Sequence, residues 1–132
     1  HESVNFAENY IAYCFAEKQG YSKFGSYTGN GSTDGTFIYT GFKPAFFITK
    51  RTNTSASWSM WDNKRGINGD IKVLYPDLSN TENNGDYMDF VSNGIKLRDG
   101  NSKWGASGDT YIYMAFAENP FVTSSGVPAC AR

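Results

Sequence analysis

Apolar and polar residues alternate with a period of two along much of the chain, which predicts short β-strands and not helices. Residues 36–42, 57–62 and 71–75 each follow this pattern. Within 57–62, Trp58 and Met60 share one face, which favours a place in the core for both side chains. The pattern therefore predicts an all-β protein.

A β-hairpin is the clearest local prediction. Residues 87–91 and 95–98 alternate, and Asn93 and Gly94 lie between them. Asn-Gly between two such runs favours a tight turn, because both residues tolerate positive φ.

Turn sequences rich in Gly and Asn recur at short intervals, at 29–35, 66–69 and 83–85. Several intervening strands are apolar on both faces, so they need cover on both sides and a second layer. A length of 132 residues suits one domain. We therefore predict one β-sandwich domain over residues 1–132, an antiparallel jelly roll of about nine strands with little or no helix.

Residues 10–17 (YIAYCFAE) resemble residues 111–118 (YIYMAFAE), near the opposite end of the chain. Two interpretations stay open. The N-terminal strand, within 1–18, either pairs inside its own sandwich or adds to a neighbouring subunit through main-chain hydrogen bonds. The candidate residues for such strand exchange are Tyr10, Ile11, Tyr13 and Phe15.

Net charge is −1, so the basic surface that nucleic acid requires is not expected. No apolar run approaches the ~20 residues of a membrane span, so we expect no membrane insertion. Two cysteines, Cys14 and Cys130, fit a buried thiol with a tail thiol, or one disulfide. Their redox state stays open.

Catalytic chemistry has little support in the sequence. His1 is the only histidine, which argues against a Ser-His-Asp, Cys-His or zinc site. Most acidic residues are scattered at turns, and Glu17 and Glu118, which end the two similar segments, favour solvated strand ends over a catalytic pair. We expect no catalytic residue, no metal and no cofactor.

Two kinds of surface site remain as candidates. Trp104, in the loop 101–109, is the candidate sugar contact, because exposed aromatic faces stack on sugar rings. Asn30 and Asn53 each begin an acceptor triplet for glycosylation, and both triplets lie in segments that we expect to be loops.

A resemblance to a known family rests on the segments 10–17, 20–31 (GYSKFGSYTGNG), 37–46, 50–52, 58–62, 74–76, 89–98 (DFVSNGIKLR) and 111–121. These segments resemble an uncharacterised domain family of bacteriophage proteins, notably from aquatic phages, which is similar to concanavalin-like jelly rolls. The resemblance implies a virion-associated protein and supplies no active site.

Together these observations predict a non-enzymatic structural protein of an extracellular or virion assembly: a tail fibre, an appendage or a capsid decoration. Its expected partners are further copies of itself or other virion proteins. One alternative is the protomer of a helical extracellular filament joined by N-terminal strand exchange. The other is a carbohydrate-binding module for host recognition, which would bind a surface polysaccharide.

Overall fold

The computed structural model describes residues 9–66 and 68–120. Within these residues the chain forms strands and turns and no helix. The strands are β1 (Ser22–Thr28), β2 (Phe37–Tyr39), β3 (Pro44–Arg51), β4 (Ser59–Asp62), β5 (Ile71–Val73), β6 (Asn83–Gly85), β7 (Met88–Val91), β8 (Gly94–Leu97) and β9 (Thr110–Ala117). All paired strands are antiparallel, and the predicted all-β sandwich is confirmed.

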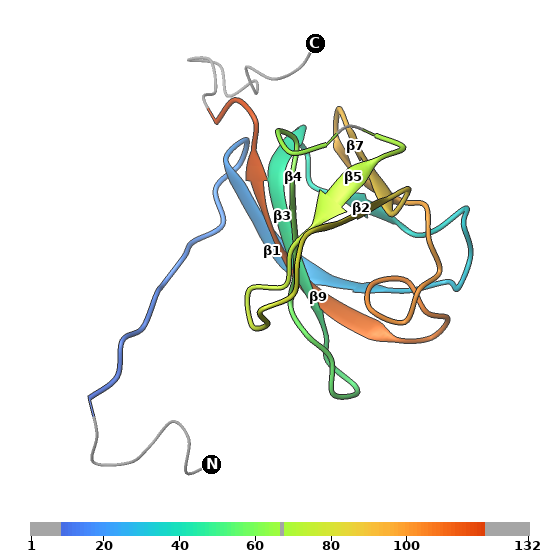
Figure 1. Ribbon diagram of the computed structural model, residues 1–132. Helices are drawn as coiled ribbons and strands as arrows, with labels where there is room; N and C mark the ends of the chain where they lie inside the picture. The colour runs from blue at the N-terminus through green and yellow to red at the C-terminus, as the bar shows by residue number, and fades with distance from the viewer. Residues whose placement is uncertain (1–8, 67, 121–132) are drawn as a thin grey trace.

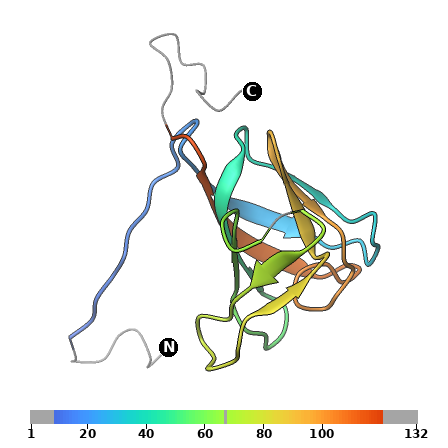
Figure 2. The ribbon, with the colours of Figure 1, turned by 45° about the horizontal axis from the view of Figure 1, so that its top comes forward.

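Two layers enclose the core. One layer is a four-stranded sheet in the order β1-β9-β3-β4, and the other contains the sheet β2-β8-β7 (Figures 1 and 2). The two-stranded sheet β5-β6 adjoins the free edge of β4, where Met60 and Leu74 form a bridge. Between the two layers lie side chains such as Phe47, Trp61 and Tyr111 from the first layer and Ile95 and Leu97 from the second, all fully buried.

The alternation of residues 57–62 is confirmed, but the expected core face is wrong. Ser59 and Trp61 point into the core, whereas Trp58 and Met60 are only half-buried. β4 pairs with β3 so that Trp61 lies opposite Phe47 on the inner face. A period-two pattern identifies two faces, and the register with β3 decides which one is buried.

The hairpin of β7 and β8 is confirmed, and its turn differs from the prediction. Val91 pairs with Gly94, so the two-residue loop is Ser92-Asn93. No described non-glycine residue has positive φ. Gly94 is required for another reason, because a Cβ atom there would lie 2.2 Å from the carbonyl oxygen of Ile38 on β2.

The two similar segments have different structures. Residues 111–117 belong to β9, which lies between β1 and β3. Residues 9–17 form no strand, and a bridge between Lys18 and Ser22 precedes β1. The part of this segment nearest residue 9 lies away from the sandwich, as the blue trace in Figures 1 and 2 shows.

Candidate functional site

The outer face of the four-stranded sheet is unusually apolar. The strand register aligns Phe24, Met114, Ile48 and Met60 in one row across all four strands. These side chains are half-buried, and the neighbouring Ile112 is exposed. The outer face of an antiparallel sandwich normally carries polar side chains that water solvates. This face carries apolar side chains in their place.

An aromatic cluster occupies one end of this outer face. The Phe116 ring lies 6.0 Å from both the Phe24 and the Phe46 ring, measured between centroids. Tyr21 packs edge-on against Phe116 at 6.0 Å. Phe15 completes the cluster, at 5.8 Å from Phe116 and 6.2 Å from Phe24.

Phe15 belongs to the segment 9–17, which we term the N-terminal arm. Its four large apolar side chains are exposed, with relative accessibilities of 52% for Tyr10, 83% for Ile11, 82% for Tyr13 and 59% for Phe15. These are the four residues that the sequence suggested for strand exchange. The structure brings them together along one extended segment beside the outer face.

Polar contacts hold the base of the arm. The Ser22 hydroxyl donates to the carbonyl oxygen of Ala16 at 2.9 Å and accepts from the Lys18 N–H at 3.1 Å. The Lys23 ammonium pairs with Glu17 at 2.6 Å. This hydrogen bond from Lys23 is the main reason that the pKa of the Glu17 carboxyl is lowered.

An open apolar groove lies where the arm meets the sheet. It has a volume of ≈ 690 Å³ and is lined by Tyr13, Ile48, Trp58, Pro76, Asp77 and Met114. Asp77 accepts a hydrogen bond from the Trp58 N–H at 3.1 Å, and the Lys50 ammonium lies 5.7 Å from the Trp58 ring centroid. Apart from Asp77, the walls are aromatic or aliphatic, so the groove suits an apolar side chain.

Residues 1–120 match the family model of a domain of unknown function, DUF7483. The chain belongs to the DUF7483 family. No curated protein and no solved structure matches it. The DUF7483 match mentions neither phage proteins nor a concanavalin-like fold, so that resemblance stays a prediction.

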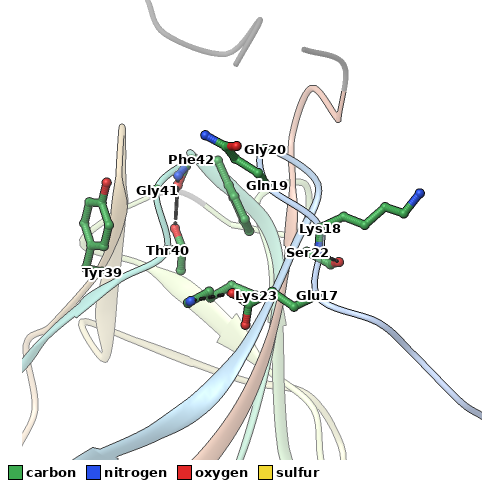
Figure 3. A pocket seen from close by; sticks show the side chains of 10 residues that line it. All are labelled: Glu17, Lys18, Gln19, Gly20, Ser22, Lys23, Tyr39, Thr40, Gly41 and Phe42. Carbon is green, nitrogen blue, oxygen red and sulfur yellow. Dashed lines mark hydrogen bonds and ion pairs between the residues drawn. The ribbon is translucent and has the colours of Figure 1, made fainter. Parts of the chain in front are cut away.

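A polar pocket with a volume of ≈ 380 Å³ lies between the start of β1 and the end of β2 in the DUF7483 sandwich (Figure 3). Tyr39, 63% exposed, stands on one side, and the Glu17–Lys23 pair lies on the other. The Thr40 hydroxyl donates to the Phe42 carbonyl oxygen at 2.6 Å. Glu17, Lys23 and Thr40 are therefore already paired within the chain, which leaves these three side chains poorly suited to bind a ligand.

Trp104 does not offer a sugar-binding surface. Its side chain is 2% exposed and packs against Trp61 at 5.4 Å and Tyr87 at 4.9 Å between ring centroids. The expected surface position is therefore wrong, because the loop 101–109 folds back over the core. Within residues 9–66 and 68–120, the large exposed aromatic side chains are on the arm, on Tyr21 just before β1, and on β2.

The glycosylation candidates Asn30 and Asn53 are both exposed. Each side-chain amide is engaged: Asn30 donates to the Asp34 carbonyl oxygen, and Asn53 donates to the Asp109 carboxylate, both at 2.9 Å. Cys14 is a free and exposed thiol, so the expected burial of this residue is wrong. Cys130 lies outside the described residues.

Glu17 and Glu118 lack the raised pKa of a poised general acid. Glu17 and Glu118 have separate partners, since Glu118 pairs with Lys43 at 2.8 Å. That contact lowers the pKa of Glu118, as the hydrogen bond from Lys23 does for Glu17. A general acid needs the opposite shift, towards neutral pH.

Metal and membrane sites also lack support in the part of the chain that the structure describes. Across residues 9–66 and 68–120, no three His, Cys, Asp or Glu side chains gather in a metal-binding group. The same residues contain no helix long and apolar enough to cross a membrane.

Sequence reasoning identified the arm and missed the outer face. The signal for the face was present, because residues 46–48 and 112–116 are apolar at consecutive positions. Such runs predict strands that are covered on both sides, whereas the structure covers only one side of β3 and β9 with a second sheet.

Proposed function

We propose that this protein is a non-enzymatic structural component of an extracellular assembly, and that it associates with further copies of itself through the N-terminal arm. The observation that carries the proposal is the arm itself. Four large apolar side chains, Tyr10, Ile11, Tyr13 and Phe15, are exposed on one extended segment that has no place in its own sheets.

Exposed apolar surface of this kind marks an interaction site. Burial stabilises by roughly 25 cal/mol per Å² of apolar surface, and contiguous patches are uncommon on monomeric proteins. An extended segment that leaves its domain is also a common means of joining subunits. The net charge of −1 opposes association only weakly.

The assembly that we propose is a bacteriophage virion, in which the domain serves as part of a tail fibre, an appendage or a capsid decoration. The support is the resemblance of segments along most of the chain to phage proteins. A structural role also accords with the lowered carboxylate pKa values and the paired polar groups of the pocket.

The second candidate is the protomer of a helical extracellular filament. It is favoured by an arm that joins none of its own sheets, because head-to-tail contacts that do not close generate open fibres. The carbohydrate-binding alternative loses its candidate residue, since Trp104 is buried.

Self-association of the full chain tests the proposal. We expect size exclusion and negatively stained images to show oligomers or filaments at high protein concentration. Tyr13→Asp with Phe15→Asp should return the chain to monomers, because charges on the arm oppose its burial. Tyr39→Asp is the matched control: it changes an exposed aromatic residue outside the arm and should leave association intact. A wild-type chain that stays monomeric at every concentration would contradict the proposal.

A further inference from the structure

The outer face of the four-stranded sheet and the arm are two apolar surfaces on the same molecule. We infer that the outer face is the receptor for the N-terminal arm of a second copy of this chain, with the groove beside Ile48, Trp58 and Met114 receiving an aromatic side chain of that arm. This inference rests on the proposed function and names the surface to which the arm binds.

Phe15 already shows how the arm contacts this face. Its ring packs on Phe116 and Phe24 at centroid distances of 5.8 and 6.2 Å, within the usual range for aromatic pairs. The face therefore accepts an aromatic side chain from an extended segment. The same chemistry continues from this cluster along the row of Phe24, Met114, Ile48 and Met60.

The groove extends this contact surface. Ile48, Trp58, Pro76 and Met114 supply apolar walls around a volume of ≈ 690 Å³. Tyr13 of the same chain borders the groove but remains 82% exposed, so its ring does not fill the space. A large aromatic side chain inserted from another molecule would bury both the ring and these walls.

The arm has the side-chain pattern that such a surface needs. Ile11, Tyr13 and Phe15 follow each other at every second position, as Ile112, Met114 and Phe116 do on the outward side of β9. In an extended segment, residues at every second position point to the same side. Because Phe15 packs on its own sheet, the arm can present Ile11 and Tyr13 to the outer face of a second molecule.

The path of the arm directs it to a second molecule. The Ser22 hydroxyl holds Ala16, and the aromatic cluster holds Phe15, so the base of the arm is fixed on its own sheet. Beyond this point the trace diverges from the sandwich in both views (Figures 1 and 2). Ile11, with 83% of its side chain exposed, is therefore accessible to the outer face of a neighbour. Each copy then has one donor and one receptor.

Mixing two defective chains tests this pairing. The donor variant is Ile11→Asp with Tyr13→Asp, and the receptor variant is Ile48→Lys with Ile112→Lys. Each variant alone should stay monomeric by size exclusion. An equimolar mixture should form dimers of one chain of each kind, because the receptor variant keeps an intact arm and the donor variant keeps an intact face. Tyr39→Lys serves as the control for an added surface charge.

Crosslinking guards against variants that fail to fold. A chain carrying Ile11→Cys, Cys14→Ser and Cys130→Ser is mixed with a differently sized chain carrying Cys14→Ser, Cys130→Ser and Ile112→Cys, because Ile11 lies on the side of the arm that should meet the outer face. We expect mild oxidation to join the two chains in a disulfide. The same pair with Tyr39→Cys in place of Ile112→Cys should give little product.

The outcomes separate the inference from the proposed function. Wild-type chains that never associate would overturn both. Association that the donor variant abolishes but the receptor variant retains would place the arm on another surface, which overturns this inference and leaves the proposed function standing. A mixture without mixed dimers, or equal crosslinking at positions 112 and 39, would also overturn it.

Discussion

Trp104 connects the loop 101–109 to both layers of the sandwich. Its ring lies edge-on to Trp61 of β4, its other neighbour is Tyr87, and its carbonyl oxygen accepts a 2.8 Å hydrogen bond from the Tyr27 hydroxyl. The residue covers the core at the end of the sandwich where β1 ends and β9 begins.

This position predicts a large effect of Trp104→Ala on stability. Truncation of a buried tryptophan removes its packing and leaves a cavity, so we expect a loss of about 3–5 kcal/mol in the free energy of unfolding. Denaturant unfolding measures this loss. Tyr39→Ala is the control and should cost much less, because that ring is exposed. A Trp104→Ala chain as stable as the wild type would contradict the assignment to the core.

Individual residues show where sequence reasoning succeeds and fails. The spacing of Ile71, Val73 and Tyr75 predicted one buried face, and all three side chains are buried. The spacing of Trp58 and Met60 predicted the wrong buried face, since both faces of residues 57–62 carry a tryptophan. Partner strands decide such cases, because burial depends on the register with β3 and not on composition.

At the level of elements, similar sequences adopt different structures in the arm and in β9. β9 has hydrogen-bonded neighbours on both sides, β1 and β3. The chain before β1 pairs with it only at the Lys18–Ser22 bridge. At Ala16 the backbone carbonyl oxygen accepts its hydrogen bond from the Ser22 hydroxyl and not from a neighbouring strand. Propensity cannot distinguish the two segments, because strand formation depends on the available partners.

The structure therefore predicts that the arm is dispensable for folding. A chain lacking residues 1–15 keeps the Lys18–Ser22 bridge and the Glu17–Lys23 pair. It loses the two ring contacts of Phe15, each worth about 0.5–1.5 kcal/mol, so we expect a small loss of stability and a cooperative transition. Thermal unfolding followed by circular dichroism tests this expectation. Full-length Phe15→Ala should show a similar loss, and outright misfolding of the shortened chain would show that the arm belongs to the core.

At the scale of the whole molecule, the sandwich has one sheet face buried by the second layer and one face left apolar and open. The inner face contributes Phe47, Trp61 and Tyr111 to the core, while the outer face presents Met114 and Ile112. The two-layer fold was predictable from the alternation. The open second face was not, because sequence pattern shows that a strand is apolar on both sides but not what covers each side.

Three buried tyrosines on the inner face determine how the stability of the whole molecule changes at alkaline pH. Tyr27 stacks on Tyr111 at 5.0 Å between ring centroids and lies 6.3 Å from Tyr113. Burial raises the pKa of all three hydroxyls above the ordinary value of about 10. In the unfolded chain the same hydroxyls lose their protons near that ordinary value.

Above about pH 10 the unfolded state therefore binds fewer protons than the folded state, and the free energy of unfolding falls as pH rises. Each such tyrosine contributes a slope of up to ~1.4 kcal/mol per pH unit until it ionises in the folded state. Denaturant unfolding at a series of alkaline pH values measures the slope. Tyr113→Phe removes one of the three groups and should make the slope shallower, whereas stability that is unchanged between neutral and strongly alkaline pH would contradict the burial of these hydroxyls. Because the three rings belong to the single hydrophobic core that both layers share, their ionisation should unfold the sandwich as a unit and not only detach the edge strand β1.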